Sequence, residues 1–245
     1  MSAQKVLAEI IKHCNLGGVE VIKITGTDRD VLVQCHDEDK TLYVVGNIKS
    51  EIPEFKGEFG ITNLKMLSGL LNFSHFQEAT FKVLTRKVDD VDMPSQLQFK
   101  GKGSKSQFNL MDSRYVPKQA KVSEIPWEVE IDDLTKDTLT EFQQFAGLYS
   151  EIDKHFNISV ENGNVNVAFG EEASSTHSGS MRLTAAKTNS TIAPLSFPVD
   201  KFIMLMKLAI ASENGKIMIT SKGLLGLDVE TEFGVYHYYL RQIAR

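Results

Sequence analysis

The chain has 245 residues, of which 42% are hydrophobic and 24% are charged, a composition that is typical of an ordinary folded protein and excludes a disordered chain. Its formal net charge of −5 argues against a generally basic nucleic-acid-binding protein. Two cysteines, Cys14 and Cys35, are too few for a disulfide scaffold or a four-cysteine zinc site, and we expect both to be small core residues in a reducing compartment.

Four segments carry apolar residues at the spacing of an amphipathic helix with one buried face. In the first segment, Leu7, Ile10, Ile11 and Cys14 lie on one such face. The four predicted helices are Ala3–Cys14, Asn63–Phe73, Leu134–Tyr149 and Asp200–Ala211. Polar residues stand at the expected N-cap positions of the last three helices, and these are Asn63, Asp133 and Asp200.

Between the helices, apolar and polar residues alternate, which is the period of a half-buried strand. Turn sequences such as Asn162-Gly163 and Asn214-Gly215 separate these segments. The predicted strands are Val19–Thr25, Val31–Cys35, Leu42–Ile48, Glu58–Ile61, Thr80–Thr85, Leu97–Gly101, Gln107–Met111, Glu128–Ile131, Asn157–Val160, Val165–Phe169, Met181–Ala185, Pro194–Phe197, Lys216–Thr220, Gly226–Glu230 and Tyr236–Leu240.

The pattern forms a unit of strand, helix and three strands, about 60 residues long, which occurs four times. Two units per domain predict an N-terminal domain at residues 1–118 and a similar C-terminal domain at residues 128–245. Residues 119–127 form the predicted linker, since this stretch and its surroundings contain Pro117 and Pro126 and show no periodicity. Hairpins with few crossover helices favour an α+β fold with antiparallel sheets and helices on one side.

No apolar run approaches the roughly 18 residues that cross a bilayer. The N-terminal residues also lack the apolar stretch and cleavage site of a secretory signal. We therefore expect a cytoplasmic protein, in the host cytoplasm if it is viral, with no membrane partner.

The sequence lacks the motifs of a nucleotide-binding loop, a nucleophile elbow and a histidine metal site. Gly101–Lys105 contains Gly, Lys and Ser, but it lies between two predicted strands and so favours a basic hairpin tip. The carboxylate runs Asp37–Asp39 and Asp89–Asp92 fit either a metal site or acidic loops. We expect no catalytic site, no cofactor and no bound metal.

Six lysines and four carboxylates lie on the predicted helices, whereas the rest of the chain is acidic. Lys5 and Lys12 are seven residues apart and share one helix face. Such a surface fits an ordinary solvated helix, and it equally fits a phosphate-facing surface that attracts DNA without reading its sequence. The candidate DNA-facing residues are Lys5, Lys12, Lys65, Lys136, Lys201 and Lys207.

The fourfold repeat, together with Leu224–Leu240 and with Asn109–Asp112 before the linker, resembles the DNA sliding clamps of the proliferating cell nuclear antigen type. Phe59–Leu64 and Ser196–Asp200 are similar to the strand-to-helix step of T4-type phage clamps. The resemblance extends over nearly the whole chain, whose length fits a two-domain clamp. The tail after Tyr239 lacks the proline of the cellular clamps, and this difference favours a phage clamp.

The resemblance implies a homotrimeric ring around double-stranded DNA, with two clamp domains per chain, helices on the inner face and antiparallel sheets outside. It pairs the strand Gln107–Met111 with the strand Met181–Ala185 of the next subunit. The weakly positive helices would attract phosphates and still allow sliding, and an acidic exterior would repel other DNA. The implied interface residues are Phe108, Leu110, Met181 and Leu183.

Clamps of this family act as processivity factors: a DNA polymerase is tethered by a short peptide that docks between the two domains, and a clamp-loader ATPase places the ring on DNA. The resemblance therefore implies both partners, and T4-type clamps add a role in late transcription. The implied groove residues are Tyr43, Val122, Ile125, Leu224, Tyr239 and Leu240. Ordinary core positions are the equal alternative for Leu224 and Leu240.

Three other interpretations stay open. A polymerase accessory protein of clamp fold could act as a monomer or dimer without encircling DNA, but it would need more basic charge on its helices. An enzyme of an unrelated α+β fold would need a pocket with converging polar groups. A structural phage protein would not need positive helix faces.

Overall fold

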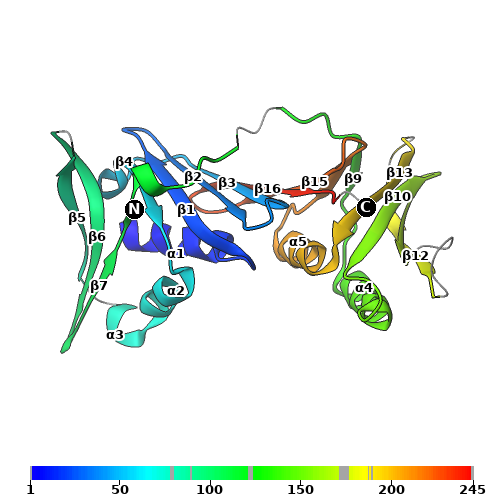
Figure 1. Ribbon diagram of the computed structural model, residues 1–245, viewed down its shortest axis with the longest axis horizontal. Helices are drawn as coiled ribbons and strands as arrows, with labels where there is room; N and C mark the ends of the chain where they lie inside the picture. The colour runs from blue at the N-terminus through cyan, green and yellow to red at the C-terminus, as the bar shows by residue number, and fades with distance from the viewer. Residues whose placement is uncertain are drawn as a thin grey trace. The chain divides into compact units, whose positions relative to one another are not determined.

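The computed structural model describes residues 2–77, 80–88, 90–120, 124–170, 177–186, 188 and 190–243. The chain folds as two compact units, one formed by residues 1–121 with residues 231–236, and the other by residues 122–230 with residues 237–245 (Figure 1). Within the described ranges, no helix is long and apolar enough to cross a membrane. The structure is α+β with antiparallel sheets, as the hydrophobic patterns predict.

The first unit contains two antiparallel sheets, whose strand orders are β8-β4-β1-β2-β3 and β5-β6-β7. Its helices are α1 (Ala3–Cys14), α2 (Leu64–Asn72) and α3 (Ser74–Gln77). Its strands are β1 (Val19–Gly26), β2 (Val31–Asp37), β3 (Leu42–Ile48), β4 (Gly57–Ile61), β5 (Thr80–Val88), β6 (Val91–Gly101), β7 (Ser104–Asn109) and β8 (Met111–Asp112).

The second unit repeats this plan with the strand orders β12-β11-β10-β13 and β16-β15-β14-β9. Its helices are α4 (Lys136–Tyr149) and α5 (Val199–Ala211). Its strands are β9 (Val129–Ile131), β10 (His155–Glu161), β11 (Asn164–Phe169), β12 (Gly179–Ala185), β13 (Ile192–Pro198), β14 (Ile217–Thr220), β15 (Leu224–Glu230) and β16 (Gly234–Arg241), of which residues 234–236 belong to the first unit.

Aromatic residues anchor the helices of the second unit to its sheet. Phe142 of α4 is fully buried, and its ring lies 5.2 Å from the rings of both Phe156 on β10 and Phe202 on α5. Both pairs have the edge-to-face geometry that aromatic rings prefer. The apolar faces of α4 and α5 are thereby held against the strands, and their polar faces remain in solvent.

The first unit uses the apolar face of α1 in the same way. Val6, Leu7, Ile10 and Ile11 are each at most 3% exposed. The Ser2 hydroxyl accepts a hydrogen bond from the Lys5 N–H and so caps the start of the helix. The bounds Ala3–Cys14, predicted from periodicity, are confirmed.

Two predicted N-caps are wrong. Helix α4 begins after Thr135, whose hydroxyl accepts from the Thr138 N–H, and not after Asp133. Helix α5 begins at Val199, so Asp200 lies in its first turn, where a carboxylate interacts favourably with the helix dipole. Asn63 is an N-cap, but it has a left-handed backbone and forms no side-chain cap bond.

His13, near the end of α1, is only 4% exposed and stacks on Tyr236 with ring centroids 4.2 Å apart. Burial, and then the nearby Lys12 charge, lower the pKa of His13 from 6.5 to about 4. The folded state thus keeps this imidazole neutral, whereas the unfolded chain protonates it below pH 6.5. Stability that depends on the neutral imidazole is therefore complete above that pH and is lost as the pH falls towards 4.

We predict that acidification from pH 7 to pH 4 removes about 3 kcal/mol of unfolding free energy through His13. Urea unfolding at a series of pH values measures this loss, and His13→Phe should reduce the pH dependence by that amount. The exposed His75 supplies the matched control, His75→Gln. An unchanged pH dependence in His13→Phe would contradict the assignment.

Candidate nucleic-acid interface

The helices of the first unit present an exposed basic surface. Lys5, Ala8 and Lys12 are exposed along one side of α1, and Lys65 is exposed at the start of α2. One carboxylate, that of Glu9, accompanies these three lysines on the two helices. The first unit therefore carries a positive excess on its helices.

Helices α1 and α2 lie side by side (Figure 1). Residues of both helices line an open cavity of about 410 Å³. Glu9 and Lys12 line this cavity together with Ser68 and Asn72. The Glu9 carboxylate accepts a hydrogen bond of 2.6 Å from the Thr231 hydroxyl, and burial raises the pKa of Glu9. Because Thr231 holds this carboxylate, Glu9 is attached to the turn before β16.

The helices of the second unit are close to electrically neutral. Lys136 and Lys207 are exposed, but Lys201 is half-buried and burial lowers its pKa. Three carboxylates, those of Asp137, Glu141 and Asp200, stand on the same helices. Each unit thus holds three of the six predicted lysines, but the positive excess belongs to the first unit, because one carboxylate accompanies its lysines and three accompany those of the second.

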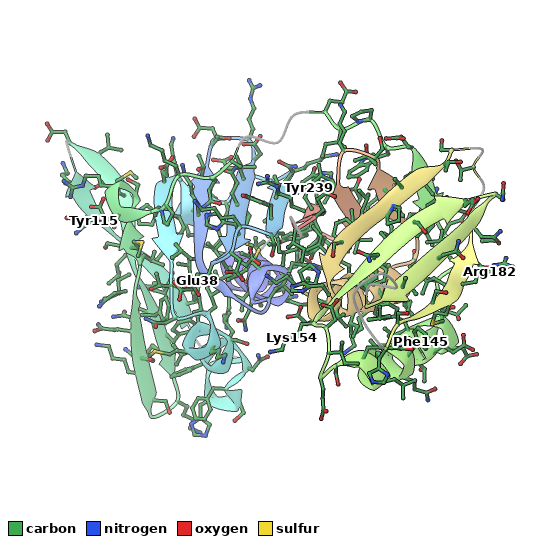
Figure 2. The ribbon with its side chains drawn as sticks, turned by 45° about the vertical axis from the view of Figure 1, so that its right-hand side comes forward. Glu38, Tyr115, Phe145, Lys154, Arg182 and Tyr239 are labelled. Atoms are coloured by element: carbon green, nitrogen blue, oxygen red, sulfur yellow. The ribbon has the colours of Figure 1, made fainter. Side chains whose placement is uncertain are left out.

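Strands β7 and β12 each lie at the end of a sheet, and in the described part of the chain nothing pairs with their outer edges. Phe108 and Leu183 are buried in their own units, whereas Leu110 and Met181 are half-buried. Helix α4 packs beside β12, where the Tyr149 hydroxyl donates to the Ser178 carbonyl oxygen at 3.2 Å. Figure 2 labels Phe145 on α4 and Arg182 on β12, and a Cβ added at Gly179 of β12 would lie 3.1 Å from the Phe145 ring.

The predicted strand Gln107–Met111 is wrong at its end. Strand β7 ends at Asn109, the Leu110 N–H donates to the Ser95 carbonyl oxygen, and residues 111–112 pair with β4 as β8. Arg86 and Arg114 both bind the Asp112 carboxylate and hold its pKa well below the usual range. The chain therefore changes sheets at Leu110, and an ion-pair cluster fixes that change.

An aromatic surface occupies the second unit around Tyr239 (Figure 2). Trp127 stacks on Tyr239 with ring centroids 6.4 Å apart and an angle of 8°, and it lies directly over Gly226. His237 also stacks on Tyr239 and contacts the Asp228 carboxylate at 2.7 Å. Burial, and then the Asp228 charge, raise the pKa of Tyr239. The result is a half-buried stack of three aromatic rings with the Asp228 carboxylate beside it.

The predicted groove residues differ in their surroundings. Three of them are half-buried in the second unit, namely Ile125, Leu224 and Tyr239. Leu240 is fully buried, which agrees with the alternative that it is an ordinary core residue. Tyr43 is half-buried on β3 of the first unit, and Val122 lies outside the described residues. Sequence analysis missed Trp127, although it is the single tryptophan of the chain and stands alone in a segment without periodicity.

The carboxylate run at Asp37 closes a turn. The Asp37 side chain accepts from the N–H groups of Thr41 and Leu42 and from the Thr41 hydroxyl, at 2.7–2.9 Å. No group of three or more His, Cys, Asp or Glu that could hold a metal ion occurs in the described ranges. The Gly101–Lys105 segment forms the predicted hairpin tip, with Gly101 paired to Ser104 across Lys102 and Gly103.

In comparisons with known proteins, the sequence matches no family model and no curated protein. The fold, in contrast, is similar to the crystal structure of proliferating cellular nuclear antigen from Entamoeba histolytica, with a TM-score of 0.66 and 15% identity. The similarity covers 98% of this chain and 96% of that chain. The chain therefore has a sliding-clamp fold.

We predict that Gly226→Ala displaces Trp127, since an added Cβ would lie 2.4 Å from the indole ring. Such overpacking costs about 1–3 kcal/mol, and the more exposed indole should shift its emission to longer wavelength. Because Trp127 is the single tryptophan, the emission spectrum reports this position alone.

The matched control is Gly69→Ala, since a Cβ at Gly69 meets no atom within 4 Å. Its emission spectrum should equal that of the wild type. An unchanged spectrum in Gly226→Ala would contradict the contact between Trp127 and Gly226.

Proposed function

We propose that this chain is a DNA sliding clamp, a processivity factor that encircles double-stranded DNA as a homotrimeric ring and tethers a DNA polymerase. The observation that carries the proposal is a clamp fold spanning the chain together with the edge strands β7 in the first unit and β12 in the second, whose outer edges are unpaired among the described residues. In this proposal, residues 1–118 and 128–245 are two clamp domains joined by a linker at residues 119–127.

Ring closure would supply the outer edges of β7 and β12 with partners. Strand β7 of one subunit would pair with β12 of the next, which would satisfy the backbone groups that an edge strand exposes. Beside β12, the end of α4 exposes Leu148 by 74%, and Ile152 just beyond it is 49% exposed. Exposed apolar side chains next to an open edge are typical of a surface that another chain covers.

The charge of the helices suits sliding rather than tight binding. The three first-unit lysines would give a trimer three weakly basic patches, and phosphate contacts of this kind do not depend on the base sequence. A weak attraction permits movement along the duplex, while enclosure by the ring prevents dissociation. Residence time then comes from topology and not from affinity.

The proposed partners follow from the same fold. A polymerase peptide would dock near Ile125, Leu224 and Tyr239, where Trp127 adds aromatic area, and a clamp-loader ATPase would open the ring. The similarity of Phe59–Leu64 to T4-type clamps extends the proposal to a phage clamp that acts in the host cytoplasm and also serves late transcription. The clamp itself would catalyse no reaction.

We predict a native mass of three times 27.4 kDa by light scattering at high protein concentration. Leu148→Glu should shift the mass towards the monomer, because it places a charge on the apolar surface beside β12 without entering the core. Gln143→Glu, on another side of the same exposed helix, is the matched control and should leave the mass unchanged.

A persistent monomer in the wild type would contradict the trimer. It would instead support the alternative function, a polymerase accessory protein of clamp fold that binds DNA without encircling it.

We further predict that Lys5→Gln/Lys12→Gln/Lys65→Gln weakens binding to a short linear duplex. The logarithm of the affinity falls as the logarithm of the salt concentration rises. Loss of up to three phosphate contacts should make this negative slope shallower by up to about 3. The matched variant Lys136→Gln/Lys201→Gln/Lys207→Gln should have a smaller effect, because three carboxylates already offset those lysines. Fluorescence anisotropy measures both, and the reverse order would contradict the charge assignment.

A further inference from the structure

The sheet β5-β6-β7 has one face in the core and one face in solvent. Phe99 and Leu97 on β6 are buried. The centroid of the Phe99 ring lies 5.6 Å from that of Phe76 on α3 and 5.4 Å from that of Phe81 on β5. Because successive strand residues point to opposite faces, the residues between them lie on the other side of the sheet. Figure 1 shows α2 and α3 on one side of this sheet only.

We call this solvent side the outer face, and its composition is unusual for an acidic protein. Between the β-bulge after Leu84 and the hairpin tip at Lys102–Gly103, it carries three lysines, four amides and one leucine, and no carboxylate lies on this part among the described residues. The register assigns to the outer face Lys82, Leu84, Gln96, Gln98, Lys100, Lys105, Gln107 and Asn109.

The three lysines of the outer face lie close together. Lys100 stands directly opposite Lys105, and Lys82 stands opposite Gln98, one step diagonally from Lys100. Directly opposed residues of an antiparallel pair have Cβ atoms about 4.5–5.5 Å apart, and like charges in that position destabilise the pair. Lys102 at the adjoining turn is exposed as well. The sheet thus tolerates a repulsion that folding alone does not require.

Elsewhere in the chain, Lys23, Lys56 and Lys216 pair with carboxylates. Lys23 contacts Glu58 at 3.0 Å, and Lys216 contacts Glu130 at 3.1 Å. None of the three outer-face lysines has an ion pair within the described ranges, and all three are exposed. Their charge therefore remains available to an external anion.

We propose that the outer face of β5-β6-β7 is a second nucleic-acid-binding surface, which contacts the phosphate backbone of a single strand without reading its sequence. Lysine ammonium groups and Asn and Gln amides are the side chains that commonly contact phosphates. A protein partner fits less well, since interface hot spots centre on buried aromatic side chains, and between the β-bulge after Leu84 and the hairpin tip the outer face offers only Leu84 as an apolar contact among the described residues.

This surface is separate from the helices. It lies across the sheet from α3, so a duplex that contacts the lysines of α1 and α2 would leave it free. The inference does not rest on ring formation, because it concerns one sheet of one unit.

The test is the salt dependence of binding to a 20-nucleotide oligothymidylate, measured by fluorescence anisotropy on the full chain. In Lys82→Gln/Lys100→Gln/Lys105→Gln, the negative slope of log affinity against log salt should become shallower by about 2, since each single-strand phosphate contact contributes about 0.7. Lys49→Gln/Lys118→Gln/Lys154→Gln changes the net charge equally at exposed lysines outside both basic surfaces and is the matched control, with a smaller expected change in the salt dependence. Circular dichroism confirms that both variants fold.

Two results would overturn the proposal. An equal change in both variants would mean that only net charge matters, and tighter binding of a 20-residue polyglutamate peptide to the same face would assign it to an acidic protein. Retention on nicked circular DNA should be unchanged in the outer-face variant, so failure of the encircling function would be seen separately.

Discussion

The unpaired edges of β7 and β12 are the constraint on which the proposed assembly depends. Each edge strand presents backbone N–H and C=O groups that must meet water or another strand. Strand β7 ends at Asn109, and the chain then passes into the neighbouring sheet as β8, where ion pairs hold Asp112. Leu148, exposed near β12, adds an apolar surface that favours covering by protein. In a closed ring, a single kind of subunit interface would pair the edges of β7 and β12 and would also cover Leu148.

The helices of the two units differ in net charge. The helices of the first unit hold the positive excess, whereas those of the second unit balance lysines with carboxylates. A modest attraction of this kind would guide DNA without fixing it, because phosphate contacts are strongly weakened by salt. The outer face of β5-β6-β7 is chemically distinct, since its opposed lysines have no carboxylate beside them. The two basic surfaces therefore call for separate explanations.

Sequence periodicity predicted most elements because their burial is regular. The bounds of α1 are confirmed, and α4 and α5 differ from prediction by two residues or fewer. Helix α3 escaped prediction because four residues give too little periodicity, although Phe76 anchors it to β6. The break at Leu110 depends on a contact with Ser95, and the position of Trp127 depends on Gly226. Such long-range contacts leave no local pattern.

Topological retention on DNA tests the central claim most directly. The protein would be placed on a nicked circular plasmid with a clamp loader and passed through a sizing column at moderate salt, before and after linearisation with a restriction enzyme. Encirclement predicts that the clamp travels with the circle and is released when the DNA is cut, because a ring slides off an open end. Equal retention on circular and linear DNA, or none on either, would contradict it.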